Sequence, residues 1–219
     1  MRKTNSGLIL DLAKLRILIA IISSILVVTL GFSTFNAYAG EGVNNRLVTG
    51  RLSLAAMPSS ATEIYLNGDT GDDTKDASTA ENAVQTFGKA KEIAASNPGV
   101  KTIWVTGTVF VSGDVSLSGT NAILKRDPSF RGDILRIDND ATLHDITIDG
   151  NKTAMQGSNS NVGNLVYIIG ANVDIKDGTV LQNNIVKDNN IAVGGAVYID
   201  LSTVNMTGGT IKNNQATWG

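Results

Sequence analysis

An arginine and two tyrosines recur at one fixed interval in the C-terminal half of the chain. Tyr167 lies 31 residues after Arg136, and Tyr198 lies 31 residues after Tyr167. If this interval brings the three side chains onto neighbouring strands, they stack outward about 5 Å apart, which is the spacing between strands. Exposed aromatic rings beside a charged group suit sugar rings or a protein partner. The alternative is a stacked pair of tyrosines that only stabilises the strands.

Two aspartates follow the same interval and could carry catalysis. Asp138 and Asp200 occupy equivalent positions, but Ile169 occupies the matching position between them. Hydrolysis of a glycosidic bond needs two carboxylates that flank that bond. Because the isoleucine interrupts the acidic row, the sequence favours a binding site over a catalytic one. Its candidate residues are Arg136, Tyr167, Tyr198, Asp138 and Asp200.

A second candidate is an acidic loop that could bind calcium through carboxylate oxygens. Its acids are Asp69, Asp72, Asp73 and Asp76. Their spacing does not match the EF-hand loop, and Lys75 lies among them, so a solvated loop is favoured over a metal site. His144 is the only histidine and is assigned no role. No cofactor other than calcium is expected.

These residues lie in a repeated sequence. The segment from Leu165 to Asn184 matches the segment from Ala196 to Gln215 without gaps, at an interval of 31, and a diverged copy places Leu135 and Ile137 before Val166 and Ile168. Self-similarity at this period indicates a stacked-repeat architecture. Short alternating runs bounded by Gly, Asn, Asp and Thr are typical of strands. The fold class predicted is all-β, a right-handed parallel β-helix (solenoid).

The alternation also predicts which side chains point inward and what stacks at the turns. Asn183 and Asn214 are 31 residues apart and are expected to form an amide ladder at one turn. The residues expected to face inward are Val166, Ile168, Val173, Ile175, Val180, Val197, Ile199, Val204, Met206 and Ile211.

The N-terminus has the pattern of a secretory signal peptide. A basic start precedes 14 apolar residues, Ile17 to Leu30, and then Ala37-Tyr38-Ala39, so residues 1–39 are expected to be removed. The run is short for a membrane span of about 20 residues. Subtracting its four basic residues and one acid changes the net charge from −2 to about −5. This argues against nucleic acid as a partner. Export without cysteine suggests a Gram-positive bacterium.

The rest of the chain divides into three parts. Residues 40–61 are expected to be a leader or linker, and residues 62–100 a strand, a loop and a capping helix. We place that helix at Ala80 to Ser96, because Ser78 and Glu81 form a capping-box pattern. Residues 101–219 form the coils, with a protruding loop from Lys125 to Gly132. Either Trp218 covers the last coil, or the sequence is part of a longer protein, which we favour.

The segment IYLNGDTGDDTKDASTAENAVQTFGKAKEIA resembles the opening strand, Asp/Gly loop and capping helix of bacterial pectin-lyase-like β-helix proteins. The repeats GGAVYID and VNMTGGTIKNNQA resemble the Gly/Asn-rich coils of adhesin-type surface proteins of Gram-positive bacteria. This resemblance implies a secreted or cell-surface module, adhesin-like or structural, that binds a polysaccharide or a host or cell-surface protein without catalysis. The alternative is the N-terminal part of a polysaccharide lyase or glycoside hydrolase. This fold hosts many functions, so the resemblance indicates fold more than activity.

Overall fold

Short parallel strands make up most of the structure, and helices are few. The computed structural model describes residues 61–157, 161–186 and 194–216 of the 219 in the chain. The predicted signal peptide, nearly all of the predicted leader and Trp218 lie outside these residues. Within them, no helix has the length and apolar character needed to cross a membrane.

The largest sheet has six strands in the order β1-β2-β5-β8-β11-β15, and each neighbouring pair is parallel. Parallel neighbours need a crossover, so the chain leaves this sheet and returns to it between strands. The strands are β1 (Glu63–Asn67), β2 (Thr102–Gly107), β5 (Ile123–Arg126), β8 (Thr147–Asp149), β11 (Val180–Gln182) and β15 (Thr210–Lys212).

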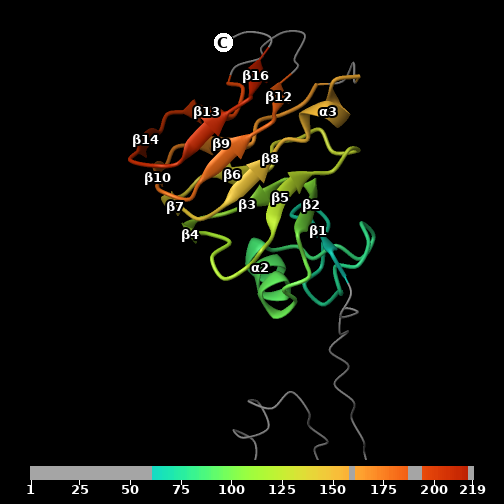
Figure 1. Cartoon of the computed structure of the whole chain (residues 1–219). Helices are drawn as coiled ribbons and strands as arrows, with labels where there is room; N and C mark the ends of the chain where they lie inside the picture. Colours follow the sequence, from blue (N-terminus) through green and yellow to red (C-terminus); the bar gives the residue numbers. More distant parts are fainter. Residues whose placement is uncertain (1–60, 158–160, 187–193, 217–219) are drawn as a thin grey trace, which may run out of the picture. The chain divides into compact units, whose positions relative to one another are not determined.

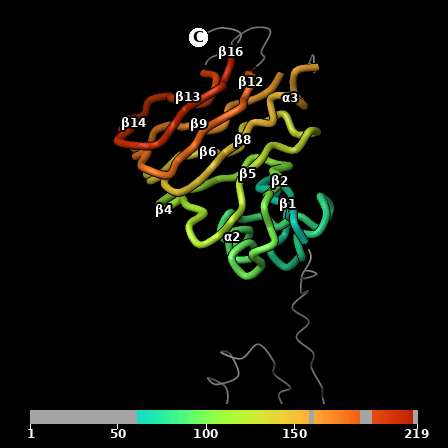
Figure 2. Tube along the Cα trace, in the orientation of Figure 1, coloured from blue at the N-terminus to red at the C-terminus, as the bar shows by residue number. Residues whose placement is uncertain are grey.

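The crossovers contain three further parallel sheets. One has the order β13-β9-β6-β3, another β14-β10-β7-β4, and a third pairs β12 with β16. Along each four-stranded sheet the colours in Figures 1 and 2 follow chain order, so neighbouring strands come from successive stretches of sequence. The strands are β3 (Val109–Phe110), β4 (Gly113–Val115), β6 (Leu135–Ile137), β7 (Ala141–Leu143), β9 (Val166–Ile169), β10 (Asn172–Ile175), β12 (Ile185–Val186), β13 (Val197–Asp200), β14 (Thr203–Met206) and β16 (Gln215–Ala216).

The interval of 31 residues is the pairing register between the last two strands of both four-stranded sheets. Val166 lies opposite Val197, and Val173 lies opposite Val204, as predicted. In the six-stranded sheet, however, Leu181 lies opposite Ile211, an interval of 30. The turn between β10 and β11 is therefore one residue longer than the turn between β14 and β15. Thr179 lies in the longer turn, where its buried side chain donates a hydrogen bond to the carbonyl of Leu143 over 2.9 Å.

This one-residue difference corrects two predictions. Val180 was expected to face inward, but it is half-buried and Leu181 is fully buried instead. The amide ladder is present, but Asn213 takes the place predicted for Asn214. The side-chain amide of Asn213 donates to the side-chain oxygen of Asn183 over 2.6 Å. The turn length decides the register here, and an ungapped match could not detect the change.

The inward-facing residues form one continuous hydrophobic core. Val166, Ile168, Val173 and Ile175 are buried, as predicted. Val197 and Val204 are only partly buried at its margin. Three further residues predicted to be inward are exposed because no strand of the described chain lies beyond β13, β14 and β15. These are Ile199, Met206 and Ile211.

The helix α2 (Phe87–Ser96) begins seven residues later than predicted and ends where predicted. Thr86 is its N-cap and accepts a hydrogen bond from the backbone amide of Lys89. Ser78 is not a helix cap, because its hydroxyl donates to Asp76 in a local turn. The predicted capping box is therefore wrong. The helix nevertheless buries one face in the core, through Phe87, Ala90 and Ala94.

The segment before the helix covers the outer edge of β1. The backbone amide of Tyr65 donates to the carbonyl of Ala77, and the amide of Val84 donates to the carbonyl of Tyr65. The amide of Asn67 donates to the carbonyl of Val84 in turn. An exposed strand edge can pair with other chains. Residues 77–84 satisfy that edge at the N-terminal end of the six-stranded sheet.

Arg126 lies inside the structure, although the sequence places it in a protruding loop. It ends β5 with its side chain fully buried. Its guanidinium donates to the carbonyls of Gly132, Gly163 and Asn164. Burial lowers its pKa to about 10, so the group stays charged at neutral pH. The buried charge fastens the loop after β5 to the segment that leads into β9.

A second, smaller hydrophobic cluster lies beside the short helix α3 (Lys152–Met155) and contains Met155, Val162 and Ile185.

Candidate functional site

The predicted arginine and tyrosine residues form one continuous stack on the sheet β3-β6-β9-β13. Arg136 pairs in register with Tyr167, and Tyr167 with Tyr198. The guanidinium carbon of Arg136 lies 5.2 Å from the centre of the Tyr167 ring. The centres of the two tyrosine rings are 4.8 Å apart, and their planes differ by 22°. The expected outward row is therefore present.

The structure adds a fourth member that the sequence reasoning missed. Phe110 pairs in register with Arg136, and its ring centre lies 5.7 Å from the guanidinium carbon. The Phe110 side chain is 58% exposed. The signal was weak because Phe110 lies only 26 residues before Arg136, outside the 31-residue interval. We call Phe110, Arg136, Tyr167 and Tyr198 the aromatic column.

The contacts within the aromatic column limit what it can offer to a ligand. Arg136 is enclosed between two rings, and Tyr167 has Arg136 on one face and Tyr198 on the other. Stacking on a sugar ring needs a free aromatic face. The ring of Phe110, at the start of the column, is the most exposed of the four. The outer face of Tyr198 lies at the other end.

The two predicted acids lie beside this column and are separated from each other. Asp138 follows β6, and its carboxylate lies 3.6 Å from the Arg136 Nε. Asp200 pairs in register with Ile169, so an isoleucine lies between the two acid positions, as the sequence predicted. The row therefore offers one ion-paired carboxylate near Arg136, and no second carboxylate beside it.

The four acids of the N-terminal loop each serve a different hydrogen bond. Asp69 accepts from the amide of Thr108, and Asp73 accepts from the amides of Gln85 and Thr86. Asp72 and Asp76 accept from residues two positions later, Thr74 and Ser78, and these bonds lower the pKa of both carboxyls. Within the described residues no three acids or histidines converge as a metal site. Calcium binding by this loop stays a prediction.

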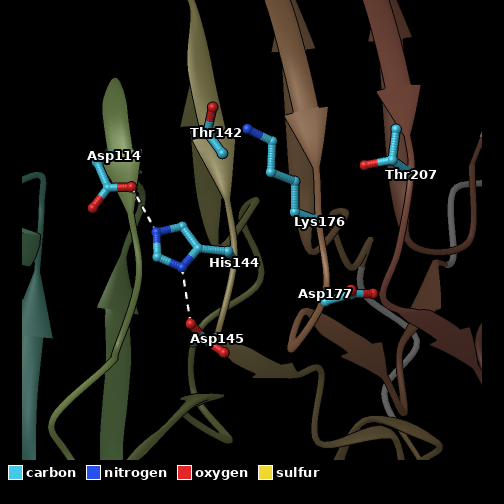
Figure 3. A pocket seen from close by; sticks show the side chains of 7 residues that line it. All are labelled: Asp114, Thr142, His144, Asp145, Lys176, Asp177 and Thr207. Carbon is cyan, nitrogen blue, oxygen red and sulfur yellow. Dashed lines mark hydrogen bonds and ion pairs between the residues drawn. The ribbon is translucent and has the colours of Figure 1, made fainter.

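A shallow polar groove of about 640 Å³ lies along the sheet β4-β7-β10-β14. Figure 3 shows its side chains projecting from successive strands and from the turns that follow them. His144 lies at its centre, and sequence reasoning gave it no role. The lining residues are Asp114, Thr142, His144, Asp145, Lys176, Asp177 and Thr207.

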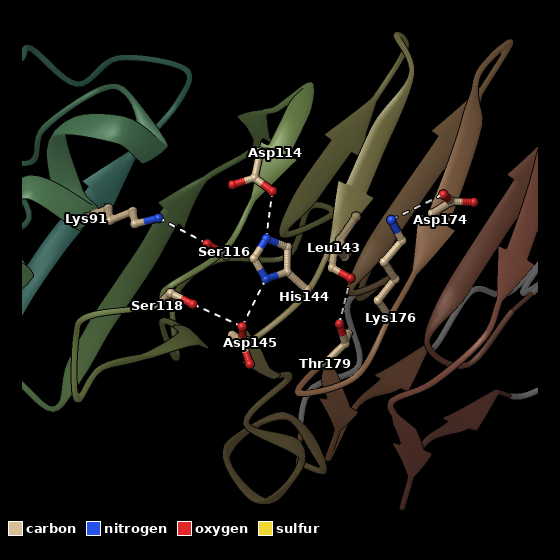
Figure 4. A network of polar contacts seen from close by, with 10 residues as sticks. All are labelled: Lys91, Asp114, Ser116, Ser118, Leu143, His144, Asp145, Asp174, Lys176 and Thr179. Carbon is tan, nitrogen blue, oxygen red and sulfur yellow. Dashed lines mark hydrogen bonds and ion pairs between the residues drawn. The ribbon is translucent and has the colours of Figure 1, made fainter.

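Both ring nitrogens of His144 face carboxylates. Nδ1 lies 3.0 Å from Asp145, and Nε2 lies 2.6 Å from Asp114 on the neighbouring strand. Hydrogen bonds to Asp145 and Asp114 raise the pKa of His144, because the charged imidazolium can donate to both. The bond from His144, with a second from Ser118, lowers the pKa of Asp145. Figure 4 shows this network.

This arrangement makes His144 a bridge between strands. A general base needs a ring nitrogen that is free to accept a proton from the substrate. Here both nitrogens are engaged, and the carboxylates favour the protonated ring. Figure 4 also shows Lys91 of α2 donating to Ser116, and Lys176 paired with Asp174. The polar side chains of the groove mostly bond to one another.

A similar column of aromatic and charged side chains lies on the six-stranded sheet. Tyr65 pairs in register with Trp104, and Trp104 with Lys125. The Lys125 ammonium lies 5.1 Å from the centre of a Trp104 ring. The same kind of stacking thus stabilises two outer faces of the molecule.

No known family model matches this sequence, and no curated protein or solved structure matches it either.

Proposed function

We propose that the chain folds as a right-handed parallel β-helix whose N-terminal end is capped by residues 77–96. Support comes from the parallel sheets and from registers of 30 and 31 residues that repeat from strand to strand. Right-handed crossovers between parallel strands are strongly favoured, because a right-twisted strand then packs back onto its own sheet. The edge contacts of Ala77 and Val84 and the buried face of α2 support the cap.

We further propose that this β-helix is a secreted or cell-surface module of a Gram-positive bacterium, adhesin-like, that binds a polysaccharide without catalysis. The observation that carries this proposal is the aromatic column with its exposed Phe110 ring. The signal-peptide pattern of residues 1–39 supports export. A host or cell-surface protein that binds the same column is the other candidate partner.

The ligand would lie across Phe110 and beside Arg136. A sugar ring can place its apolar face against the exposed Phe110 ring, while its hydroxyls bond to the Asp138 carboxylate and the Arg136 guanidinium. The two carboxylates needed for hydrolysis of a glycosidic bond are not both present there. Tyr167 holds Arg136 in position through the face that Arg136 covers.

The experiment is glycan-array binding by the purified protein and its variants. We expect Phe110→Ala and Tyr198→Ala to weaken binding by roughly tenfold each, because each removes a free ring surface. Trp104→Ala is the matched control, since it removes an outward aromatic residue that stacks with a cation on another sheet. Loss of binding in the control alone, or equal binding by all variants, would assign the aromatic column a structural role only.

The alternative function is polysaccharide cleavage, and the groove around His144 is the observation that favours it. Its carboxylates Asp114 and Asp145 lie on either side of one imidazole. Release of reducing ends or unsaturated products from any polysaccharide that the array identifies, with loss of that release in Asp114→Asn, would support this alternative.

A further inference from the structure

The last repeat, residues 194–216, presents an apolar row that nothing in the described chain covers. Ile199 is 50% exposed, Met206 44% and Ile211 46%. Their register partners one repeat earlier are Ile168, Ile175 and Leu181. These partners are at most 2% exposed. The same inward positions are therefore buried wherever another repeat lies on top of them.

The backbone of this repeat is also open. β13, β14 and β15 each stand at the end of their sheets, with one strand neighbour among the described residues. Exposed edge strands usually carry charges that oppose pairing. Residues 194–216 contain only two charged side chains, Asp200 and Lys212, and these have opposite signs. Little electrostatic repulsion or desolvation therefore opposes another strand at this edge.

The opposite end of the six-stranded sheet does not offer the same opening. Residues 77–84 already bond to the edge of β1. Beside them, the Asp69 carboxylate accepts from the amide of Thr108, just before β3. A head-to-tail contact would need this covered end as its second surface. A two-fold contact needs only one surface, because each copy presents the same face to the other.

We propose that the outer face of the last repeat, formed by β13, β14 and β15, is a self-association surface that binds the same face of a second copy of this chain about a two-fold axis. The contact continues the packing that already joins the last two repeats. It buries Ile199, Met206 and Ile211 of both copies and pairs the free strand edges. Asp200 and Lys212 supply the few charges at the contact.

The test is sedimentation velocity on the purified protein over a wide range of concentration. We expect a reversible monomer–dimer equilibrium. Ile199→Lys or Met206→Lys should raise the dimer Kd roughly 100-fold, because each change places a charge in the contact twice. Leu201→Lys is the matched control, since Leu201 is 89% exposed and follows β13 outside the apolar row. It should leave the dimer Kd nearly unchanged.

Hydrogen exchange provides a second readout that does not depend on any variant. Amides of β13, β14 and β15 should exchange more slowly as the protein concentration rises, while amides of β1 and β2 should not change. In the lysine variants, unchanged protection of β9, β10 and β11 confirms that the fold is intact. A monomer at every concentration would overturn the proposal. So would a dimer that survives both variants, or one that Leu201→Lys disrupts equally.

Discussion

Asn213 donates its side-chain amide to the side-chain oxygen of Asn183, which lies 30 residues earlier in the chain. Asn183 in turn donates to Asp149 in the repeat before it, over 2.7 Å. Asn183 and Asn213 both adopt a left-handed backbone conformation, with φ of 55°. Asparagine adopts this conformation more readily than most residues. These turns thus combine a backbone preference with a ladder of side-chain bonds between repeats.

The neighbouring Asn184 predicts the cost of losing such a bond in the interior. Its side chain is fully buried and donates to the carbonyls of Gly163 and Gly195. Asn184→Ala leaves both carbonyls without these donors and should lower the free energy of unfolding by about 2–4 kcal/mol. Asn172→Ala, at an exposed position, should cost less than about 1 kcal/mol. Urea unfolding measures both, and equal losses would contradict the structural role of Asn184.

Arg126 predicts a larger effect, because a buried charge supplies the bonds. Arg126→Met keeps much of the side-chain volume but removes the donors to three carbonyls, so we expect a loss of about 3–5 kcal/mol. Arg131 is the matched control, since its guanidinium bonds mainly within its own loop, to Pro128 and Phe130. Arg131→Met should cost about 1 kcal/mol or less. A tolerated Arg126→Met, judged by urea unfolding, would show that the loops are held by other contacts.

The His144 bridge predicts that stability depends on pH. The pKa of His144 is raised in the folded state, so its contribution is complete below the unfolded value of about 6.5 and is lost as the pH rises through the folded value. The pKa of Asp145 is lowered, so its contribution is lost as the pH falls below about 4. The bridge therefore stabilises the fold most between about pH 4 and 6.5.

Two measurements check this dependence. Urea unfolding at pH 5 and pH 8 should show that the parent loses more stability with rising pH than His144→Gln does. Because the chain has a single histidine, an NMR titration of its ring reports this one group directly. A ring that titrates at or below the ordinary pKa of histidine would contradict the bridge.

The sequence predicted the stacking of repeats better than it predicted local boundaries. The 31-residue interval correctly paired Tyr167 with Tyr198, because alternation in short strands forces equivalent side chains onto one face. It failed beyond Ile175, where a turn one residue longer shifts the register to 30. The double Asn in each repeat concealed the shift, because Asn183 can be matched with Asn213 or Asn214 equally well.

Other residues were misassigned because their partners are distant in sequence. Thr86 caps α2 with help from Asp73, which lies 13 positions earlier, so a local capping-box search selected Ser78 instead. Arg126 lies in a run of polar residues, and only the folded chain brings the carbonyls of Gly163 and Asn164 to it. The partners of His144 were equally hidden, since Asp114 lies 30 residues before it on another strand.

Cysteine cross-linking tests the stacking of repeats, on which the aromatic column and the self-association surface both depend. The chain has no cysteine, so an engineered pair reports without background. Asp174 lies opposite Asn205, whereas Thr203 is two positions out of register on the same face. Cα atoms more than about 7 Å apart cannot be bridged without backbone movement. The variant Asp174→Cys with Asn205→Cys should form an intramolecular disulfide under mild oxidation, and Asp174→Cys with Thr203→Cys should not. A disulfide in the second variant alone, or in neither, would contradict the stacked-repeat structure.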